Sequence, residues 1–371
     1  MNVLVTGAKG FIGRNLVHKL NQLADPGLAI MPYDLDSAPE DLETYISSAD
    51  VVVHLAGVNR PKDKEEFDKG NRGFTEELLE KCEKARKPRI ILSSSIQAAL
   101  ENPYGQSKLG AEEAVKAYSA RTSSPCYIFR LPNVFGKWSR PNYNSAVATF
   151  CYNIARGLPI TVNDPDAQLN LIYIDDVCNL FISAIKGELA RDDEGYAEAK
   201  PSYKTTVGFV AALIRRFRDD RESLYLPSSS DELELKLYST YLSFLPEEGF
   251  SYFPKMNIDA RGSFTELFRT AERGQVSVNI TKPGVTKGNH WHHTKNEKFV
   301  VVSGEGVIKF RGVDQIDSFE YKVSGKRIEI VDIPAGYTHS ITNTGAEDLV
   351  TIMWSNECFD PDKPDTYYLE V

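Results

Sequence analysis

Residues 2–13 read NVLVTGAKGFIG, an apolar β-branched run that passes directly into three spaced glycines. A strand followed by GxxGxxG and then by a helix-like segment, residues 11–23, is typical of the first turn of a dinucleotide-binding sheet. Glycines there let the backbone approach a pyrophosphate, which lies against the positive N-terminus of the helix. The candidate cofactor-binding residues of this turn are Gly7, Lys9, Gly10, Phe11, Ile12, Gly13 and Arg14.

The same alternation of strands and helices continues to about residue 240. Runs at 51–55, 89–93 and 125–131 are predicted strands, and 74–85 and 105–120 are predicted helices. This order predicts an α/β fold, a Rossmann-like doubly wound parallel sheet with crossover helices. The stretch between Gly13 and the Leu55-Ala56-Gly57 strand end is short, so we expect a trimmed βα segment there.

The cofactor preference has two readings. Asp34 closes a strand-like run at 29–33, where an acid favours NAD by binding its ribose hydroxyl. Because the segment is short, the register is uncertain, and Lys9 and Arg14 could instead meet the 2′-phosphate of NADP. Leu55, Ala56 and Gly57 complete the expected cofactor contacts.

A second signal is Tyr104 with Lys108, four residues apart and therefore on one face of a helix. A nearby ammonium lowers the pKa of a phenol, so that Tyr104 could transfer a proton near neutral pH. The alternative is an ordinary solvated helix face. A serine-rich strand end with Ser94 and Ser95 precedes the tyrosine and could orient a carbonyl.

Residues 1–240 resemble the extended short-chain dehydrogenase/reductases, with further matches at 54–57, 130–136 and 171–177. In that family the segment at 130–136 leads into a nucleotide-sugar pocket. The resemblance implies substrate contacts from Asn133, Lys137, Arg140 and Tyr173, although Asn133 could equally be a loop cap. Ile96 and Gln97 stand where the family's sugar 4,6-dehydratases carry an acidic pair, which favours carbonyl reduction over dehydration.

The alternation of predicted strands and helices is replaced by another pattern after about residue 259. Short β-rich runs separated by Gly, Pro, Asn or Asp predict an all-β antiparallel sandwich or barrel. The boundary is expected in the Pro- and Gly-containing stretch 242–257, which gives domains 1–245 and 246–371. Four of the chain's six histidines lie in this second part: His290, His292, His293 and His339.

The histidine spacing indicates a metal site. His290 and His292 are two apart on a strand and point to one face, and Glu297 returns after a short turn. Together with His339 they suit a divalent ion such as Zn²⁺, with an open position for substrate. The alternative is a set of polar residues in a small barrel. The spacing from Gly284 to Gly304 resembles the first motif of the cupins, which are jelly-roll proteins. Their second motif matches from Pro334, with Ile328 in place of its leading glycine.

Residues 259–264, 284–290 and 333–339 are also similar to the deoxysugar 3,5-epimerase branch of the cupins. That resemblance implies His290 as the catalytic base and Lys287 as a substrate-binding residue. A nitrogen that ligates a metal is not free to take a proton. If His290 is a ligand, the base is therefore His292, His293 or a metal-bound hydroxide.

The two halves join through the chemistry of a 4-ketosugar. The ketone makes the hydrogens at C3 and C5 acidic, and reduction removes that acidity, so epimerisation must come first. The pairing resembles the family of the bifunctional bacterial capsular polysaccharide synthesis enzyme F. It implies C3 epimerisation of a UDP-linked 4-keto-6-deoxy-N-acetylhexosamine. NADPH reduction then gives UDP-N-acetyl-6-deoxy-L-talosamine, which precedes UDP-N-acetyl-L-fucosamine, and the resemblance also implies a zinc-bearing homodimer.

Two other functions stay open. The chain could have one activity, reductase or epimerase, with the cupin as a binding or dimerisation module. A non-enzymatic cofactor sensor would leave Tyr104 and Lys108 without a role. Net charge is −9, from 43 basic and 52 acidic residues, which disfavours nucleic acid and anionic membranes as partners. No apolar run approaches the ~20 residues that span a bilayer. Five scattered cysteines without CxxC favour a reducing cytoplasm.

Overall fold

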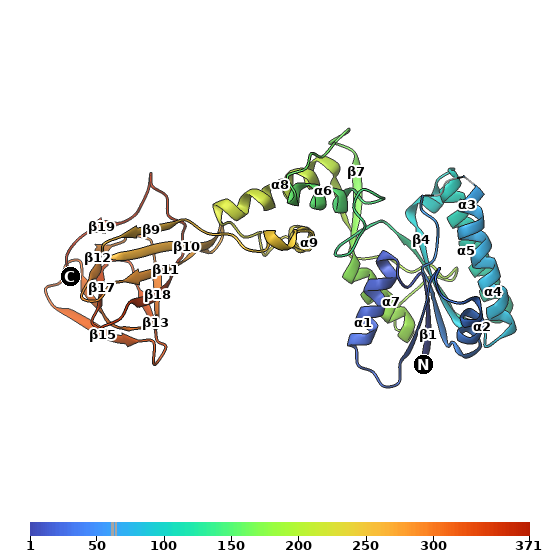
Figure 1. Ribbon diagram of the computed structural model, residues 1–371, viewed down its shortest axis with the longest axis horizontal. Coiled ribbons are helices and arrows are strands. Elements are labelled where there is room, and N and C mark those ends of the chain that lie inside the picture. Colours follow the sequence, from blue (N-terminus) through green and yellow to red (C-terminus); the bar gives the residue numbers. More distant parts are fainter. Residues whose placement is uncertain (61–62, 64) are drawn as a thin grey trace. The chain divides into compact units, whose positions relative to one another are not determined.

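The computed structural model describes residues 1–60, 63 and 65–371 of the chain. It divides into two compact units (Figure 1). Met1–Ile214 and Lys236–Leu245 form the first unit, and Arg215–Leu235 and Pro246–Val371 form the second. The second unit thus takes in residues 215–235, which the sequence-based division assigns to the first domain. That division at residue 245 stays a prediction.

The first unit is built on a five-stranded parallel sheet with the strand order β2-β1-β3-β4-β5. The strands are β1 (Asn2–Thr6), β2 (Ala29–Tyr33), β3 (Val51–His54), β4 (Arg89–Ser95) and β5 (Cys126–Leu131). The helices are α1 (Phe11–Gln22), α2 (Pro39–Ser48), α3 (Glu65–Phe67), α4 (Phe74–Lys84), α5 (Pro103–Thr122) and α7 (Ile174–Lys186), with two irregular turns, η1 (Asp68–Gly73) and η2 (Ile96–Ala99). Helices α1 and α7 cover one face and α2, α4 and α5 the other (Figure 1), which confirms the predicted doubly wound fold.

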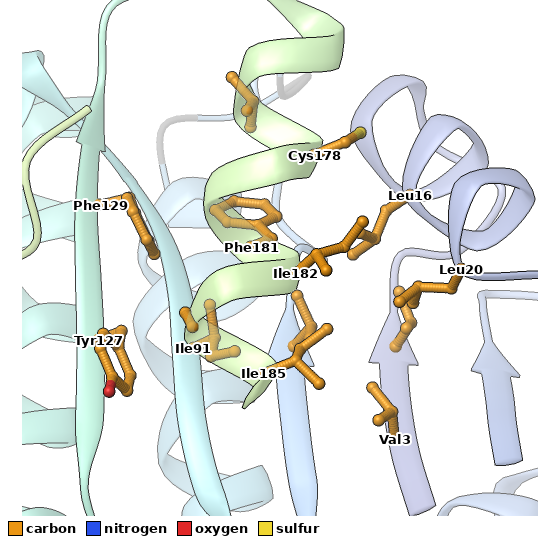
Figure 2. Packing of buried hydrophobic residues seen from close by; sticks show 14 of the residues in the cluster. Val3, Leu16, Leu20, Ile91, Tyr127, Phe129, Cys178, Phe181, Ile182 and Ile185 are labelled. Carbon is orange, nitrogen blue, oxygen red and sulfur yellow. The ribbon is translucent and has the colours of Figure 1, made fainter. Parts of the chain in front are cut away.

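Burial on both faces explains the sequence of the strands. In β1, Val3 and Val5 belong to the core cluster under α1 and α7, and Leu4 belongs to the cluster on the opposite face. Because every side chain of a central parallel strand is covered, such strands are continuously apolar instead of alternating. Figure 2 shows Phe181 of α7 facing Phe129 and Ile91 of the sheet. Each fully buried side chain of this size contributes ~1.5–3 kcal/mol to stability.

The expectation of a trimmed βα segment between Gly13 and Leu55 is wrong, because the strand and the helix of this segment are both present. The segment contains both β2 and α2, and α2 has only 10 residues. Strand β2 pairs with β1 in parallel from Asn2↔Ala29 to Thr6↔Tyr33. The strand that ends just before Asp34 is therefore the regular second strand of the fold.

A smaller sheet extends the first unit beyond β5. Its order is β6-β7-β8, with β6 (Asn133–Phe135), β7 (Gln168–Tyr173) and β8 (Tyr203–Thr206). Helix α6 (Ala146–Ala155) also belongs to the first unit, whereas α8 (Val207–Ser223) runs from the first unit into the second and α9 (Glu232–Leu242) runs from the second back into the first. Strands β6 and β7 carry Asn133 and Tyr173, and Lys137 and Arg140 follow β6, outside the strands.

The second unit has two antiparallel sheets, as predicted for a cupin. A six-stranded sheet has the order β16-β13-β18-β11-β10-β9, and a five-stranded sheet has the order β15-β14-β17-β12-β19. A short turn, η3 (Glu247–Gly249), precedes them. The strands are β9 (Met256–Asp259), β10 (Gly262–Thr270), β11 (Gly274–Thr281), β12 (Thr286–Trp291), β13 (Glu297–Ser303), β14 (Glu305–Gly312), β15 (Ser318–Ser324), β16 (Ile330–Ile333), β17 (Tyr337–Asn343), β18 (Leu349–Ser355) and β19 (Tyr367–Tyr368).

The space between these sheets is only partly apolar. Phe299, Ile308, Phe310 and Ile341 belong to a buried core cluster. Elsewhere the inner face carries polar residues, among them Asn279, so that a cavity is left open there. Among the described residues, no helix is both long and apolar enough to cross a membrane.

Candidate functional site

The glycine turn after β1 packs tightly against neighbouring backbone, so that side chains would not fit at two of its positions. Gly7 has φ +67, and a Cβ placed on it would lie 2.7 Å from the backbone nitrogen of Ala56. A Cβ on Gly13 would lie 2.1 Å from the Gly7 carbonyl oxygen. Helix α1 begins after Gly10, and no side chain caps it. Its first N–H groups are therefore free for an anion, and these residues fit the pyrophosphate of a dinucleotide.

The end of β2 is tied to this turn through Asp34. The Lys9 backbone N–H donates to the Asp34 carboxylate at 2.6 Å, and the Leu35 N–H donates to its other oxygen at 2.8 Å. The Lys9 ammonium forms an ion pair with Asp36. The Arg14 guanidinium lies 4.3 Å from the centre of the Trp138 ring. Both cations that the sequence offered to a 2′-phosphate thus have other partners.

Tyr104 and Lys108 start helix α5. Asn102 caps the helix by accepting from the Gly105 N–H at 2.8 Å. Lys108 is buried and donates to the Ser93 carbonyl at 3.1 Å. Burial lowers the pKa of its ammonium to about 8.

Tyr104 differs from the expectation in its acidity. Burial raises the pKa of the phenol, and a hydrogen bond with Ser95 opposes that rise. The expected lowering by Lys108 is absent, because desolvation dominates and the ammonium is directed at Ser93. The phenol therefore keeps its proton at neutral pH, which is the form that can donate to a ketone oxygen under reduction.

The two candidate serines have different surroundings. Ser95 contacts Tyr104, whereas Ser94, the next residue of the strand, points to the other face and hydrogen-bonds Glu112. Glu112 is fully buried and also accepts from Arg130 at 2.6 Å and from the Tyr196 hydroxyl at 2.7 Å. The structure thus brings only Ser95 to the tyrosine. Ser94 belongs to a buried network that satisfies the glutamate.

The predicted substrate residues are dispersed over the small sheet and the loop that follows β6. Asn133 donates to the Asn170 carbonyl at 3.2 Å, and Lys137 pairs with Asp175 at 2.7 Å. The Tyr173 ring packs against Phe135. None of the residues Asn133, Lys137, Arg140 and Tyr173 lines the open groove of about 650 Å³ described in this unit.

That groove contains residues that the sequence reasoning missed. Arg60, Tyr143, Thr161 and Asn163 contribute to its walls. The guanidinium groups of Arg60 and Arg140 lie 5.4 Å and 4.9 Å from the Tyr143 ring centre. An aromatic ring with cations on it and nearby amides can hold a base and a phosphate. The only signal in the sequence was the polar stretch that follows Arg140.

The second unit encloses a cavity of about 450 Å³ that contains the histidine cluster. The donor atoms of His290, His292, Glu297 and His339 all lie within 4.8 Å of one another. They come from β12, the residue just after it, the start of β13, and β17. Strand β12 has a register shift between Gly288 and His290, and His290 then pairs with His339. Such a bulge redirects the side chains that follow it.

His293 is placed elsewhere. Its side chain is exposed and lies 4.4 Å from the Trp291 ring and 5.0 Å from the Tyr367 ring, measured between ring centres. It does not line the cavity. Three of the four clustered histidines therefore converge, and His293 is outside the set.

The four-residue cluster fits a divalent cation. His292 Nε2, Glu297 Oε2 and both ring nitrogens of His339 are buried without a hydrogen-bond partner. Glu297 Oε2 lies 3.4 Å from His292 Nε2 and 3.3 Å from His339 Nε2. Burial lowers the pKa of His290 to about 4, so it is neutral at pH 7. Burial opposes ionisation of Glu297, yet contacts with His292 and His339 hold its pKa below its usual range. These are the protonation states that metal binding requires.

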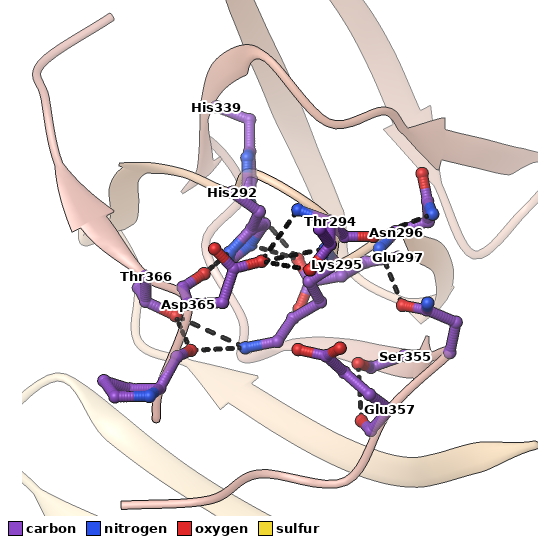
Figure 3. A network of polar contacts seen from close by, with 12 residues as sticks. His292, Thr294, Lys295, Asn296, Glu297, His339, Ser355, Glu357, Asp365 and Thr366 are labelled. Atoms are coloured by element: carbon purple, nitrogen blue, oxygen red, sulfur yellow. Dashed lines mark hydrogen bonds and ion pairs between the residues drawn. The ribbon is translucent and has the colours of Figure 1, made fainter. Parts of the chain in front are cut away.

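Figure 3 shows Asp365 and Thr366 of the C-terminal segment 364–369 beside His292 and the loop that leads to Glu297. The Asp365 backbone carbonyl accepts from His292 Nδ1 at 2.6 Å, which leaves Nε2 facing the cluster. The Asp365 carboxylate accepts from the N–H groups of His293, Thr294 and Lys295 at 3.0, 2.9 and 2.9 Å. Although burial raises the pKa of this carboxyl, these bonds hold it well below its usual range. Asp365 thereby fixes the loop between two ligands.

Lys287 also faces the cavity, and it is fully occupied as a donor. Its ammonium donates to Asn279 Oδ1 at 2.7 Å, to the Ile280 carbonyl at 2.8 Å and to the Ser263 carbonyl at 3.4 Å. Burial lowers its pKa. An amine that donates three hydrogen bonds has no lone pair to accept a proton. Its geometry fits a fixed positive charge at the cavity wall.

Comparison with known proteins covers the chain from end to end. A model described as the NAD dependent epimerase/dehydratase family matches residues 3–194, and one described as the polysaccharide biosynthesis C-terminal domain matches residues 257–367. A Pseudomonas aeruginosa protein named UDP-2-acetamido-2,6-beta-L-arabino-hexul-4-ose reductase is 46% identical, over 100% of this chain and 99% of its own length.

Solved structures agree with these matches. The crystal structure of the capsular polysaccharide assembling protein CapF from Staphylococcus aureus is 49% identical, with a TM-score of 0.93 over 100% of both chains. The predicted resemblance to the capsular enzyme family is thus confirmed. The structure of UDP-glucuronic acid 4-epimerase from Bacillus cereus in complex with NAD covers 68% of this chain with a TM-score of 0.57 at 19% identity. That likeness shows a common fold alone.

Proposed function

Because the chain belongs to the NAD dependent epimerase/dehydratase family, we propose that it is a two-site nucleotide-sugar enzyme. The domain at 246–371 epimerises C3 of a UDP-linked 4-keto-6-deoxy-N-acetylhexosamine. The domain at 1–245 then reduces the C4 ketone to UDP-N-acetyl-6-deoxy-L-talosamine, the precursor of UDP-N-acetyl-L-fucosamine for a capsular polysaccharide. The observation that carries the proposal is the full-length match to a protein named as a UDP-linked 4-ketosugar reductase.

For the reductase, the contact between Ser95 and a protonated Tyr104 supports the roles of orienting the ketone and donating its proton. Lys108 contributes a buried ammonium one helical turn away. Hydride comes from a reduced nicotinamide dinucleotide, whose pyrophosphate the turn from Gly7 to Gly13 would hold. The resemblance to the capsular enzymes implies NADPH as that dinucleotide, so the assay compares NADPH with NADH.

For the epimerase, four converging donors support a divalent cation held by His290, His292, Glu297 and His339. Such a cation, zinc in the related enzymes as the resemblance implies, would act as a Lewis acid toward the ketone. We assign His290 to this set as a ligand, since its ring nitrogen lies with the other three donors. Lys287 contributes fixed positive charge beside the substrate.

The order of the steps follows from the acidity of the substrate. The hydrogen at C3 is acidic only while C4 is a ketone, so the epimerase must act on the substrate before the reductase. Reduction at C4 then makes the inverted C3 configuration permanent. A chain that carries both activities converts an epimer that could revert into a stable alcohol.

Two substitutions test this proposal. Tyr104→Phe is expected to abolish dinucleotide oxidation while deuterium exchange at C3 in heavy water continues, and Tyr45→Phe in α2 is the matched control. His290→Ala is expected to abolish exchange and bound metal, with the exposed His293→Ala as control. If His290→Ala keeps its metal and loses exchange, His290 is the base instead of a ligand. If it leaves both unchanged, the cupin is a binding or dimerisation module and the two-site proposal fails.

We also propose that the chain forms a homodimer through the outer face of its six-stranded sheet. Val278, Ile352, Val300 and Ile330 are direct cross-strand neighbours on that face. Ile330 is 63% exposed and Ile352 37% exposed. A contiguous apolar row on an exposed sheet is typical of a buried interface. All five cysteines are free thiols, which supports a reducing compartment and, with it, the cytoplasm.

A further inference from the structure

In the proposed reductase, an acidic residue, Asp34, lies at the place where the adenosine of the dinucleotide would bind. Strands β1 and β2 are parallel and in register to Thr6↔Tyr33, so the glycine turn and Asp34 leave the sheet at the same edge. The Ala8 N–H donates to the Tyr33 carbonyl at 3.2 Å, which ties the two connections together. In folds of this kind, the side chain at this position meets the ribose of the adenosine.

The Asp34 carboxylate is held in place by the backbone. One oxygen accepts from the Lys9 N–H at 2.6 Å and the other from the Leu35 N–H at 2.8 Å. The Asp34 N–H itself donates to the Ser37 hydroxyl at 3.0 Å. Each carboxylate oxygen keeps a further lone pair, so the group can accept from the hydroxyls of a ribose. It is a preformed acceptor with a full negative charge.

Cations that would be needed for a 2′-phosphate are engaged elsewhere. Lys9, the cation of the glycine turn, forms an ion pair with Asp36. Arg14 lies over Trp138, 4.3 Å from the ring centre. At this edge of the sheet, the two carboxylates of Asp34 and Asp36 therefore outnumber the single ammonium of Lys9. A phosphate monoester adds about −1.5 to −2 charges near pH 7, and like charges at close range disfavour binding.

We infer that this chain uses NADH in preference to NADPH, with Asp34 as the residue that sets the preference. This departs from the NADPH that the resemblance to the capsular enzymes implies, and it rests on the proposed reductase function. The ribose with a free 2′-hydroxyl donates to Asp34, whereas a 2′-phosphate would have to displace a carboxylate that two backbone N–H groups hold.

The test is direct binding of NADH and of NADPH to the full chain by isothermal titration calorimetry, without sugar. We expect the dissociation constant for NADH to be lower by about tenfold or more, the range of a single specificity contact. Asp34→Asn is expected to weaken the binding of NADH and to strengthen the binding of NADPH, so that the ratio of the two dissociation constants comes close to one. Asp25→Asn is the matched control. Asp25 precedes β2, at the opposite end of the strand, and its carboxylate accepts from the Gly27 N–H.

Three outcomes overturn the inference. The first is tighter binding of NADPH than of NADH by the unaltered chain. The second is a ratio of the two dissociation constants that Asp34→Asn leaves unchanged, although this variant unfolds at the same temperature as the unaltered chain. An equal change of the ratio in Asp25→Asn would assign the effect to net charge alone. Binding of neither dinucleotide would instead refute the reductase proposal itself, so the two failures are distinguishable.

Discussion

The Asp365 carboxylate offers the sharpest test of how the C-terminal segment supports the metal cluster. It accepts three backbone N–H groups and the Thr294 hydroxyl, the last at 3.1 Å. Asp365→Ala removes all four bonds. Each is worth about 0.5–1.5 kcal/mol net when water can replace the lost acceptor. The exposed loop at 293–294 permits that replacement. The sum is therefore ~2–6 kcal/mol of local stability.

The consequence for the metal follows from His292. Its Nδ1–H donates to the carbonyl of the same Asp365, so a displaced segment no longer fixes the ring with Nε2 toward the cluster. Loss of such an outer partner typically lowers metal affinity by about 10–100-fold. The assay is competition for zinc between the purified chain and a chromophoric chelator. Asp362→Ala, which removes an exposed carboxylate just before this segment, is the control.

The reasoning would be refuted by a zinc affinity for Asp365→Ala within about threefold of the unaltered chain, well below the usual effect of such a partner. A loss of affinity accompanied by global unfolding would not discriminate. Asp365→Asn serves as the second variant for that reason. It keeps one carbonyl acceptor for the loop, so its zinc affinity should fall between the other two.

Three further predictions concern the other parts of the molecule. Since burial lowers the pKa of Lys108 to about 8, kcat/KM of the reductase should fall as pH rises through about 8. The ammonium is present below that value and lost above it, and a pH profile that stays flat to pH 10 would contradict this role. Gly13→Ala should abolish dinucleotide binding without changing zinc content, because the new Cβ would lie 2.1 Å from the Gly7 carbonyl oxygen. Calorimetry measures the dinucleotide binding, and metal analysis measures the zinc content. Ile352→Glu should give a monomer by light scattering, whereas Ile316→Glu, at a 95% exposed position, should not; a dimeric Ile352→Glu would exclude the proposed face.

Local sequence signals predicted the fold, and they also singled out residues that the structure brings together. The glycine turn and the spacing of His290, His292 and Glu297 are short-range patterns, whereas His339 comes from a later strand and the sequence alone left the register of Asp34 open. Each of these short-range patterns depends only on strand or helix periodicity and on what immediately follows a strand. The structure places these residues as that periodicity requires.

Long-range features could not be predicted in the same way. Asp365 contacts the loop at 293–295 from the far end of the chain. Nothing in the sequence of either segment indicates a contact with the other. Tyr143 and Arg60 line the same groove although they are far apart in the sequence. The sign of the Tyr104 pKa shift depends on burial, which spacing does not reveal. Ser94 and Ser95 are an intermediate case, since strand alternation separates them but only contacts show which one meets the tyrosine.

The central claim, that one chain inverts C3 and then reduces C4, is tested most directly by the position of deuterium in the product. The unaltered chain is given the UDP-linked 4-ketosugar, reduced dinucleotide and zinc in heavy water, and the alcohol is analysed by NMR. Epimerisation before reduction should give deuterium at C3 with inverted configuration and hydrogen at C4, delivered as hydride by the dinucleotide. An alcohol that carries hydrogen at C3 with its original configuration would contradict the account.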